Sequence, residues 1–180
     1  SIYLRTLNAD YSVNEDGSMD VTETWVTVFT SSGHSVGSKV FDIPEHGEEY
    51  ELKSVRDLTN NREYVLSASA GEEDKGYCRQ FTRDGRTYFE WYDNFGDETR
   101  TFELTYTVKN AVTLYNDTAE LYWQFVGSDF GLSIDSAVCT VTLPDSAVSQ
   151  DNKIFGHLER SISGTSNAQL RADGSAVFTV

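Results

Sequence analysis

The sequence predicts an all-β protein, an antiparallel β-sandwich of about a dozen short strands with little helix. Aromatic residues make up 13% of the 180 residues, and such residues favour a pleated, half-buried surface. Turn signals recur about every 8 to 12 residues, the spacing typical of a sandwich or barrel. A chain of this length buries roughly 70% of the surface exposed when unfolded, so folding alone requires neither a metal nor a disulfide.

Alternation of apolar and polar residues defines the strands of the first half. Two Asp-Gly pairs, at 16–17 and 84–85, predict tight hairpin turns. The Ser- and Gly-rich segment 31–38 predicts a loop, and residues 93–98 predict a turn. The predicted strands span residues 2–13, 19–29, 40–43, 50–58, 62–68, 77–82 and 87–92.

The second half continues the same pattern less regularly. Strands are predicted at residues 99–108, 119–125, 134–143, 154–158, 169–172 and 176–180, and the Asp-Gly pair at 173–174 predicts a hairpin turn between the last two. In the second of these, Trp123 shares the inward face with Leu121 by the period of two, which predicts a structural role for Trp123. We expect one domain over residues 1–180, with a minor boundary near the polar segment 145–152.

The net charge of −15 is spread along the chain rather than gathered in one tail. Repulsion from phosphate excludes nucleic acid as a partner, and the same argument disfavours anionic lipid headgroups. Solubility and cation binding both fit this charge.

The two cysteines, Cys78 and Cys139, lie far apart and match no zinc spacing. They are consistent with one long-loop disulfide in an oxidising compartment or with free, buried thiols, because spacing alone does not test disulfide geometry.

Five segments, in this order, resemble the N-terminal domain of a bacterial membrane-protein family known as domain of unknown function 2207. They are residues 16–23, 42–44, 106–112, 117–123 and 138–144, and the resemblance covers about residues 10 to 160. Two positions depart from the family's pattern, because Phe41 stands where an Arg is common and Phe130 where a Trp is expected.

The resemblance implies an ectodomain on the extracellular face of a bacterial cell membrane, attached through membrane segments outside this sequence. The family has no established activity, so no catalytic residues carry over. No stretch of the sequence approaches the 18 apolar residues of a membrane span.

Two carboxylates, Glu23 and Glu120, fall within aromatic, strand-like segments. Glu23 shares its strand face with Val21 and Trp25, so burial requires it to be paired, hydrogen-bonded or protonated. A structural ion pair, with Lys109 or an Arg, and a catalytic carboxylate are both consistent with this position. Glu120 lies out of phase with its apolar neighbours and is expected on the opposite face, with a structural role.

Oxygen-rich turns make calcium the metal to consider. Asp16 and Asp20 lie in the first hairpin turn, and Asp93 and Asp97 lie in a later one. Asx-rich hairpin turns have this composition without any metal, so both interpretations stand.

Aromatic residues around the second turn suggest a ligand-binding platform. Trp91, Tyr92 and Phe95 flank this turn, and such rings bind sugars or peptides by stacking. Ordinary core packing accounts for the same residues.

Taken together, these features predict a non-enzymatic binding domain of a membrane-anchored protein, with an envelope protein or glycan as its partner. No cofactor is required. One alternative is a glycan-acting envelope enzyme that uses Glu23 or Glu120. The other is an adhesion module stabilised by calcium.

Overall fold

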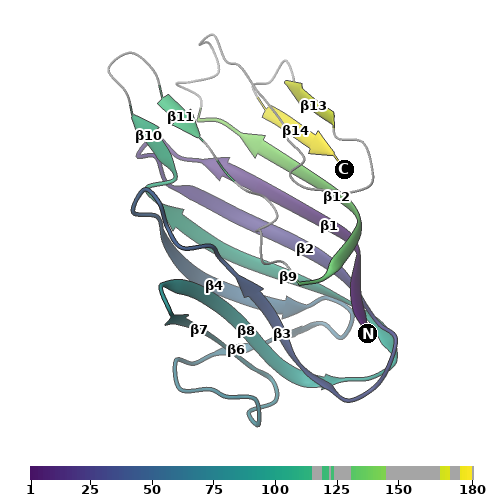
Figure 1. The fold of residues 1–180 in the computed structure, drawn as a ribbon. Coiled ribbons are helices and arrows are strands. Elements are labelled where there is room, and N and C mark those ends of the chain that lie inside the picture. The colour runs from purple at the N-terminus through teal and green to yellow at the C-terminus, as the bar shows by residue number, and fades with distance from the viewer. Residues whose placement is uncertain (115–118, 122, 124–130, 145–166, 171–174, 180) are drawn as a thin grey trace.

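A computed structural model describes residues 1–114, 119–121, 123, 131–144, 167–170 and 175–179. Every regular element among them is a β-strand, so the all-β prediction is confirmed (Figure 1). The first eight strands are β1 (Ile2–Val13), β2 (Met19–Phe29), β3 (His34–Val40), β4 (Glu49–Asp57), β5 (Arg62–Glu63), β6 (Val65–Leu66), β7 (Tyr77–Arg83) and β8 (Arg86–Phe95). The remainder are β9 (Glu98–Lys109), β10 (Val112–Leu114), β11 (Ala119–Leu121), β12 (Ser133–Thr142), β13 (Asn167–Leu170) and β14 (Ser175–Thr179).

The strands form an eight-stranded sheet, a four-stranded sheet and a two-stranded ribbon. The large sheet has the order β13-β14-β12-β1-β2-β9-β4-β5, the small sheet the order β3-β8-β7-β6, and β10 pairs with β11. The sheets are mixed rather than purely antiparallel as predicted, because β1 runs parallel to β12 and β6 runs parallel to β7. A parallel neighbour needs a long connection, and more than a hundred residues separate β1 from β12.

The Asp-Gly pairs form the hairpin turns that they predict. Gly17 has a φ of +83° between β1 and β2, and Asp84 and Gly85 have φ values of 51° and 77° between β7 and β8. Two successive positive φ values are the signature of a type I′ turn, whose twist matches that of the flanking strands.

Residues 34–40 form β3 where the sequence predicted mostly loop, and the predicted strand at 40–43 is wrong. The reason is tertiary pairing with β8, which overrides the loop-like composition. Gly37 is required there because a Cβ would lie 2.1 Å from the Trp91 ring. The predicted turn at 93–98 is shorter than expected, since β8 extends to Phe95.

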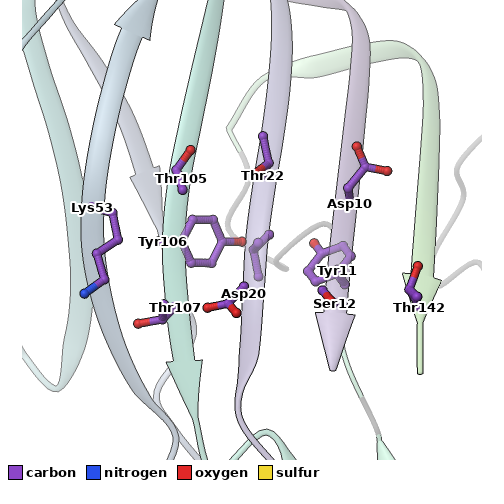
Figure 2. A pocket seen from close by; sticks show the side chains of 11 residues that line it. Asp10, Tyr11, Ser12, Asp20, Thr22, Lys53, Thr105, Tyr106, Thr107 and Thr142 are labelled. Atoms are coloured by element: carbon purple, nitrogen blue, oxygen red, sulfur yellow. The ribbon is translucent and has the colours of Figure 1, made fainter. Parts of the chain in front are cut away.

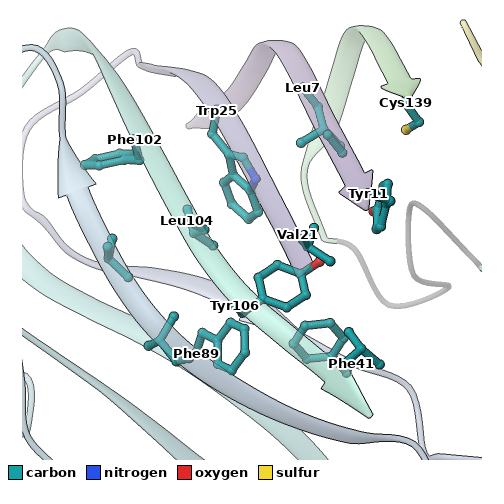
Figure 3. Packing of buried hydrophobic residues seen from close by; sticks show 14 of the residues in the cluster. Leu7, Tyr11, Val21, Trp25, Phe41, Phe89, Phe102, Leu104, Tyr106 and Cys139 are labelled. Atoms are coloured by element: carbon teal, nitrogen blue, oxygen red, sulfur yellow. The ribbon is translucent and has the colours of Figure 1, made fainter. Parts of the chain in front are cut away.

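Aromatic side chains fill the space between the small sheet and the β2–β9–β4 part of the large sheet (Figure 3). Trp25 of β2 meets Trp91 of β8 edge-to-face at 5.5 Å, and Phe89 of β8 meets Tyr106 of β9 at 5.3 Å. Ring pairs of this kind stabilise beyond their buried area, by about 0.5–1.5 kcal/mol each.

Several predictions fall outside the described residues. They concern the strand at 154–158, the polar segment 145–152 and the Asp-Gly pair at 173–174. The strands predicted at 169–172 and 176–180 correspond to β13 and β14 with small shifts at their ends.

Candidate functional site

Glu23 lies in the interior between the two sheets, with no exposed surface. The period of two along β2 aims it inward together with Trp25. Lys39 of β3 places its Nζ 3.1 Å from Glu23 Oε2, and the Trp25 indole N–H donates to Oε1 at 3.0 Å. The hydroxyl of Tyr106 donates to Oε2, and burial together with this carboxylate raises the pKa of Tyr106 well above 10.0.

The partner of Glu23 is therefore Lys39, not Lys109 or an Arg as the sequence suggested. Lys109 ends β9 on the exposed side. The error follows from the β3 prediction, because Lys39 fell between the predicted loop at 31–38 and the predicted strand at 40–43 and so had no predicted inward face.

Glu120 lies on β11, with an exposed side chain, opposite Thr113 of β10. Glu23 is enclosed, so the two carboxylates do not share a site as a pair of glycosidase carboxylates would. Trp123 is partly buried against the core and packs edge-to-face on Tyr11, with ring centroids 6.3 Å apart.

A second buried ionic cluster surrounds Arg100, which the sequence analysis missed. Its guanidinium contacts Asp57 at 3.2 Å, Asp93 at 3.0 Å and Glu98 at 2.9 Å. Asp93 also accepts hydrogen bonds from Arg62 and from the Tyr64 hydroxyl. The alternation of residues along β4 and β9 could have predicted this cluster, because it places Asp57 and Arg100 on the faces that point into the core.

The four aspartates considered for calcium do not converge. Asp20 pairs with Thr107 near the end of β9, whereas the turn that holds Asp97 precedes the start of β9. The carboxylate of Asp93 is occupied by arginine side chains. Across the described ranges, no group of three or more His, Cys, Asp or Glu side chains is placed to hold a metal ion.

Asp16 has a local role in the first hairpin. It accepts hydrogen bonds from the Ser18 hydroxyl at 2.6 Å and the Ser18 amide at 2.9 Å, and these bonds lower its pKa. The carboxylate of Asp20 accepts a hydrogen bond from the side-chain amide of Asn14 at 3.2 Å. This is the Asx-turn chemistry that needs no ion.

Trp91, Tyr92 and Phe95 are each 1% exposed and are part of the core, so they offer no exposed ring face for stacking. Trp91 and Tyr92 are consecutive residues of β8 and would normally face opposite sides, yet both are buried. The pairing of β8 with β3 is irregular at this point, between His34 and Val36. The binding-platform interpretation of these three residues is therefore wrong, and core packing accounts for them.

Cys78 and Cys139 are free and buried. They lie on β7 and β12, in different sheets. Burial raises the pKa of the Cys78 thiol to about 11 and that of the Cys139 thiol to about 12.

The outer face of the large sheet carries two adjoining shallow depressions, of about 340 Å³ and 370 Å³. Figure 2 shows the side chains that line the first of them. We call the two depressions together the outer groove. Its polar side chains come from five strands and two turns: Asp10, Ser12, Asp16, Ser18, Asp20, Thr22, Glu51, Lys53, Thr105, Thr107, Lys109, Asn110 and Thr142.

Strand register places these side chains in rows across the sheet. Asp10 lies opposite Thr22, and Thr22 lies opposite Thr105. In the next row Ser12 lies opposite Asp20, and Asp20 opposite Thr107. Neighbouring strands are about 4.8 Å apart, so hydroxyl and carboxylate groups repeat at a spacing that suits a ligand rich in hydroxyl groups.

The strands and the outer groove define an acidic, all-β domain whose two described depressions are open to solvent. The chain belongs to the family described as predicted membrane protein (DUF2207) N-terminal domain, whose model matches residues 3–180. The family's function is unknown, and no curated protein matches the chain.

The solved structures that match the chain do so with low TM-scores and share little sequence with it. A candidate protease from Parabacteroides distasonis has 8% identity and a TM-score of 0.46, with coverage of 99% of this chain and 35% of that one. An M1 zinc metallopeptidase from Deinococcus radiodurans has 11% identity and a TM-score of 0.42, with coverage of 99% and 38%. Aminopeptidase A from Legionella pneumophila has 11% identity and a TM-score of 0.44, with coverage of 99% and 19%.

The chain thus spans between 19% and 38% of the length of these structures. Within the described residues, no helix has the length and apolarity needed to cross a membrane.

Proposed function

We propose that this domain is a non-enzymatic binding module on the extracellular face of a bacterial membrane protein, and that the outer groove holds an envelope glycan. The observation that carries the proposal is the array of hydroxyl, carboxylate and ammonium groups along the groove. Hydroxyl and carboxylate oxygens accept hydrogen bonds from sugar hydroxyls, while Thr, Ser and Lys also donate.

The groove is shallow and runs across several strands, which suits an extended polymer better than a small molecule. Small-molecule sites are usually enclosed clefts or cavities. Its acidic residues, Asp10, Asp20 and Glu51, disfavour polyanionic polymers and favour neutral or amino-sugar chains.

The rival proposal, a glycan-cleaving enzyme, finds less support in the placement of its acids. A general acid must reach the glycosidic oxygen within hydrogen-bond distance. Glu23 is enclosed by Lys39, Trp25 and Tyr106, so a substrate would have to open the core to reach it.

Binding is tested by co-sedimentation of the domain with purified, insoluble cell-wall glycan. The double variant Thr105→Val and Thr107→Val removes two hydroxyls from the groove, and valine preserves β-propensity. Each lost hydrogen bond is worth about 0.5–1.5 kcal/mol, so affinity falls roughly 5- to 140-fold for the pair.

The matched control is Thr99→Val with Thr101→Val, on the same strand and outward face but outside the groove. It leaves affinity unchanged. An equal loss in both double variants would refute the groove as the site, and release of new reducing ends from the glycan would favour the enzyme instead.

The outward orientation has a separate test in the full-length protein. A protease added to intact cells removes the domain if it faces outward, whereas protection until the cells are lysed would place it inside.

A further inference from the structure

The Lys39–Glu23 pair joins the two sheets of the sandwich through their side chains. Glu23 lies on β2 of the large sheet and Lys39 on β3 of the small sheet. The Lys39 Nζ lies 3.1 Å from Oε2 and 3.4 Å from Oε1, and the side chains are 8% and 0% exposed. The ammonium nitrogen therefore touches both oxygens of the carboxyl group that it would attack.

The two oxygens of Glu23 have different partners. Oε1 accepts the Trp25 indole N–H at 3.0 Å, while Oε2 accepts the Tyr106 hydroxyl and lies nearer to the Lys39 ammonium. An N–H donor fixed on one oxygen stabilises negative charge that develops there during attack on the carboxyl carbon. A hydroxyl on the other oxygen can pass a proton to it as it leaves.

Aromatic rings surround the pair. The Nζ lies 5.0 Å from the centroid of the Phe41 ring and 6.0 Å from that of Tyr106. Exclusion of water strengthens the electrostatic effects inside such a site and removes the competing hydrolysis. Two desolvated charges carry a large penalty, and a reaction that converts both into one neutral amide removes that penalty.

We propose that Lys39 and Glu23 condense into an intramolecular amide bond that links β3 to β2 covalently. A proton passes from Nζ to Oε2, and the neutral amine then attacks Cδ to form the N–C bond, with negative charge on Oε1. A second proton passes from nitrogen to Oε2, directly or through the Tyr106 hydroxyl. The C–Oε2 bond breaks, one water molecule leaves, and the carbonyl at Oε1 reforms.

The step converts an ammonium and a carboxylate into an amide and water, with no change in oxidation state and no further reactant. It closes a loop between residues 16 positions apart. The bond would tie the edge strand β3 of the small sheet to the centre of the large one.

The intact mass of the reduced, denatured chain tests the proposal directly. The expected mass is lower than the sequence mass by one water molecule. Tryptic digestion then yields a branched peptide that contains Glu23 and an uncleaved Lys39, because an acylated lysine is not a trypsin site.

Two lysine variants sharpen the result. Lys39→Met shows the full sequence mass. Lys53→Met keeps the mass deficit, because Lys53 and Glu51 form an exposed pair at 2.9 Å without the enclosing donors and rings.

A wild-type chain at its full sequence mass would overturn the proposal whether or not the Lys39 variant folds. A water loss that maps to an Asp-Gly turn, as a succinimide, would overturn it equally.

Discussion

Removal of the Arg100 guanidinium should destabilise the fold strongly, because this group is the cation shared by three carboxylates. Asp57 and Asp93 have side chains that are 0% and 10% exposed, and Arg100 itself is 10% exposed. In Arg100→Met the methylene packing is largely kept, while Asp57 loses the cation that contacts it at 3.2 Å.

The size of the effect follows from the contacts that remain. Asp93 keeps Arg62 and the Tyr64 hydroxyl, and Asp57 keeps the backbone and side-chain amides of Asn60 at 3.0 Å and 2.8 Å. Breaking a buried pair costs about 3–5 kcal/mol. The surviving donors place this variant near the lower end, at about 3 kcal/mol, which lowers the Tm by about 6–12 °C for a chain of this size.

The same variant changes the acid limb of the stability curve. The hydrogen bond from Arg100 lowers the pKa of Glu98 below its ordinary value of 4.5. A depressed folded-state pKa contributes stability that is present above pH 4.5 and is lost as the pH falls through the folded value. Without Arg100 only the Gly96 amide still lowers this pKa, so the contribution shrinks and the loss of stability below pH 4.5 becomes shallower.

Urea unfolding at neutral and acidic pH measures both effects. Arg56→Met is the matched control, because Arg56 is exposed and makes one hydrogen bond, to Asn61 at 3.4 Å. Its expected change lies within about 0.5 kcal/mol. A loss below about 1 kcal/mol in Arg100→Met would refute the assigned role, since it is less than the penalty of one unpaired buried charge.

Three further predictions concern other parts of the fold. Gln80→Leu removes the side-chain amide that donates to the Tyr50 carbonyl at 2.6 Å and accepts from the Leu52 backbone amide at 2.8 Å. We expect the free energy of unfolding to fall by about 1–3 kcal/mol and the Leu52 amide to exchange its hydrogen faster. Unchanged exchange would contradict the role of Gln80 in covering the edge of β4. Cys78 and Cys139, with pKa values raised to about 11 and 12 by burial, should resist a thiol reagent at mildly alkaline pH until the chain is unfolded; labelling of the native protein at the rate of free cysteine would count against this. Calcium should leave the Tm unchanged, because Asp93 is already neutralised by arginine, whereas a site filled to 100 times its dissociation constant would add about 2.7 kcal/mol.

The sequence predicted most of the fold through local signals. The period of two identified the faces of β2 and β9, and the Asp-Gly pairs located two hairpins. Local signals failed at β3, where serine and glycine composition indicated a loop. The deciding interactions are the pairing of β3 with β8 and the close approach of Gly37 to Trp91, both of which depend on residues about fifty positions away.

The candidate site was harder to predict for a related reason. The period of two shows that Thr22 and Thr105 face away from the core, but not that they are neighbours, because that depends on the antiparallel register of β2 and β9. Asp10 joins them through a second register, that of β1 with β2. A polar surface assembled from three strands has no contiguous motif, so its chemistry becomes visible only when the strand order is known.

The buried carboxylate is the opposite case, because its environment was predicted correctly from the sequence and its partner was not. The alternation along β2 placed Glu23 in the core, where a carboxylate needs a partner, and Glu23 does form a buried ion pair. The choice of Lys39 over Lys109 depends on which strand lies across the sandwich, and therefore on packing between sheets rather than pairing within one. This packing brings an amine and a carboxyl together in a dry, aromatic site, so one mass measurement on the folded chain tests whether the pair stays ionic or condenses.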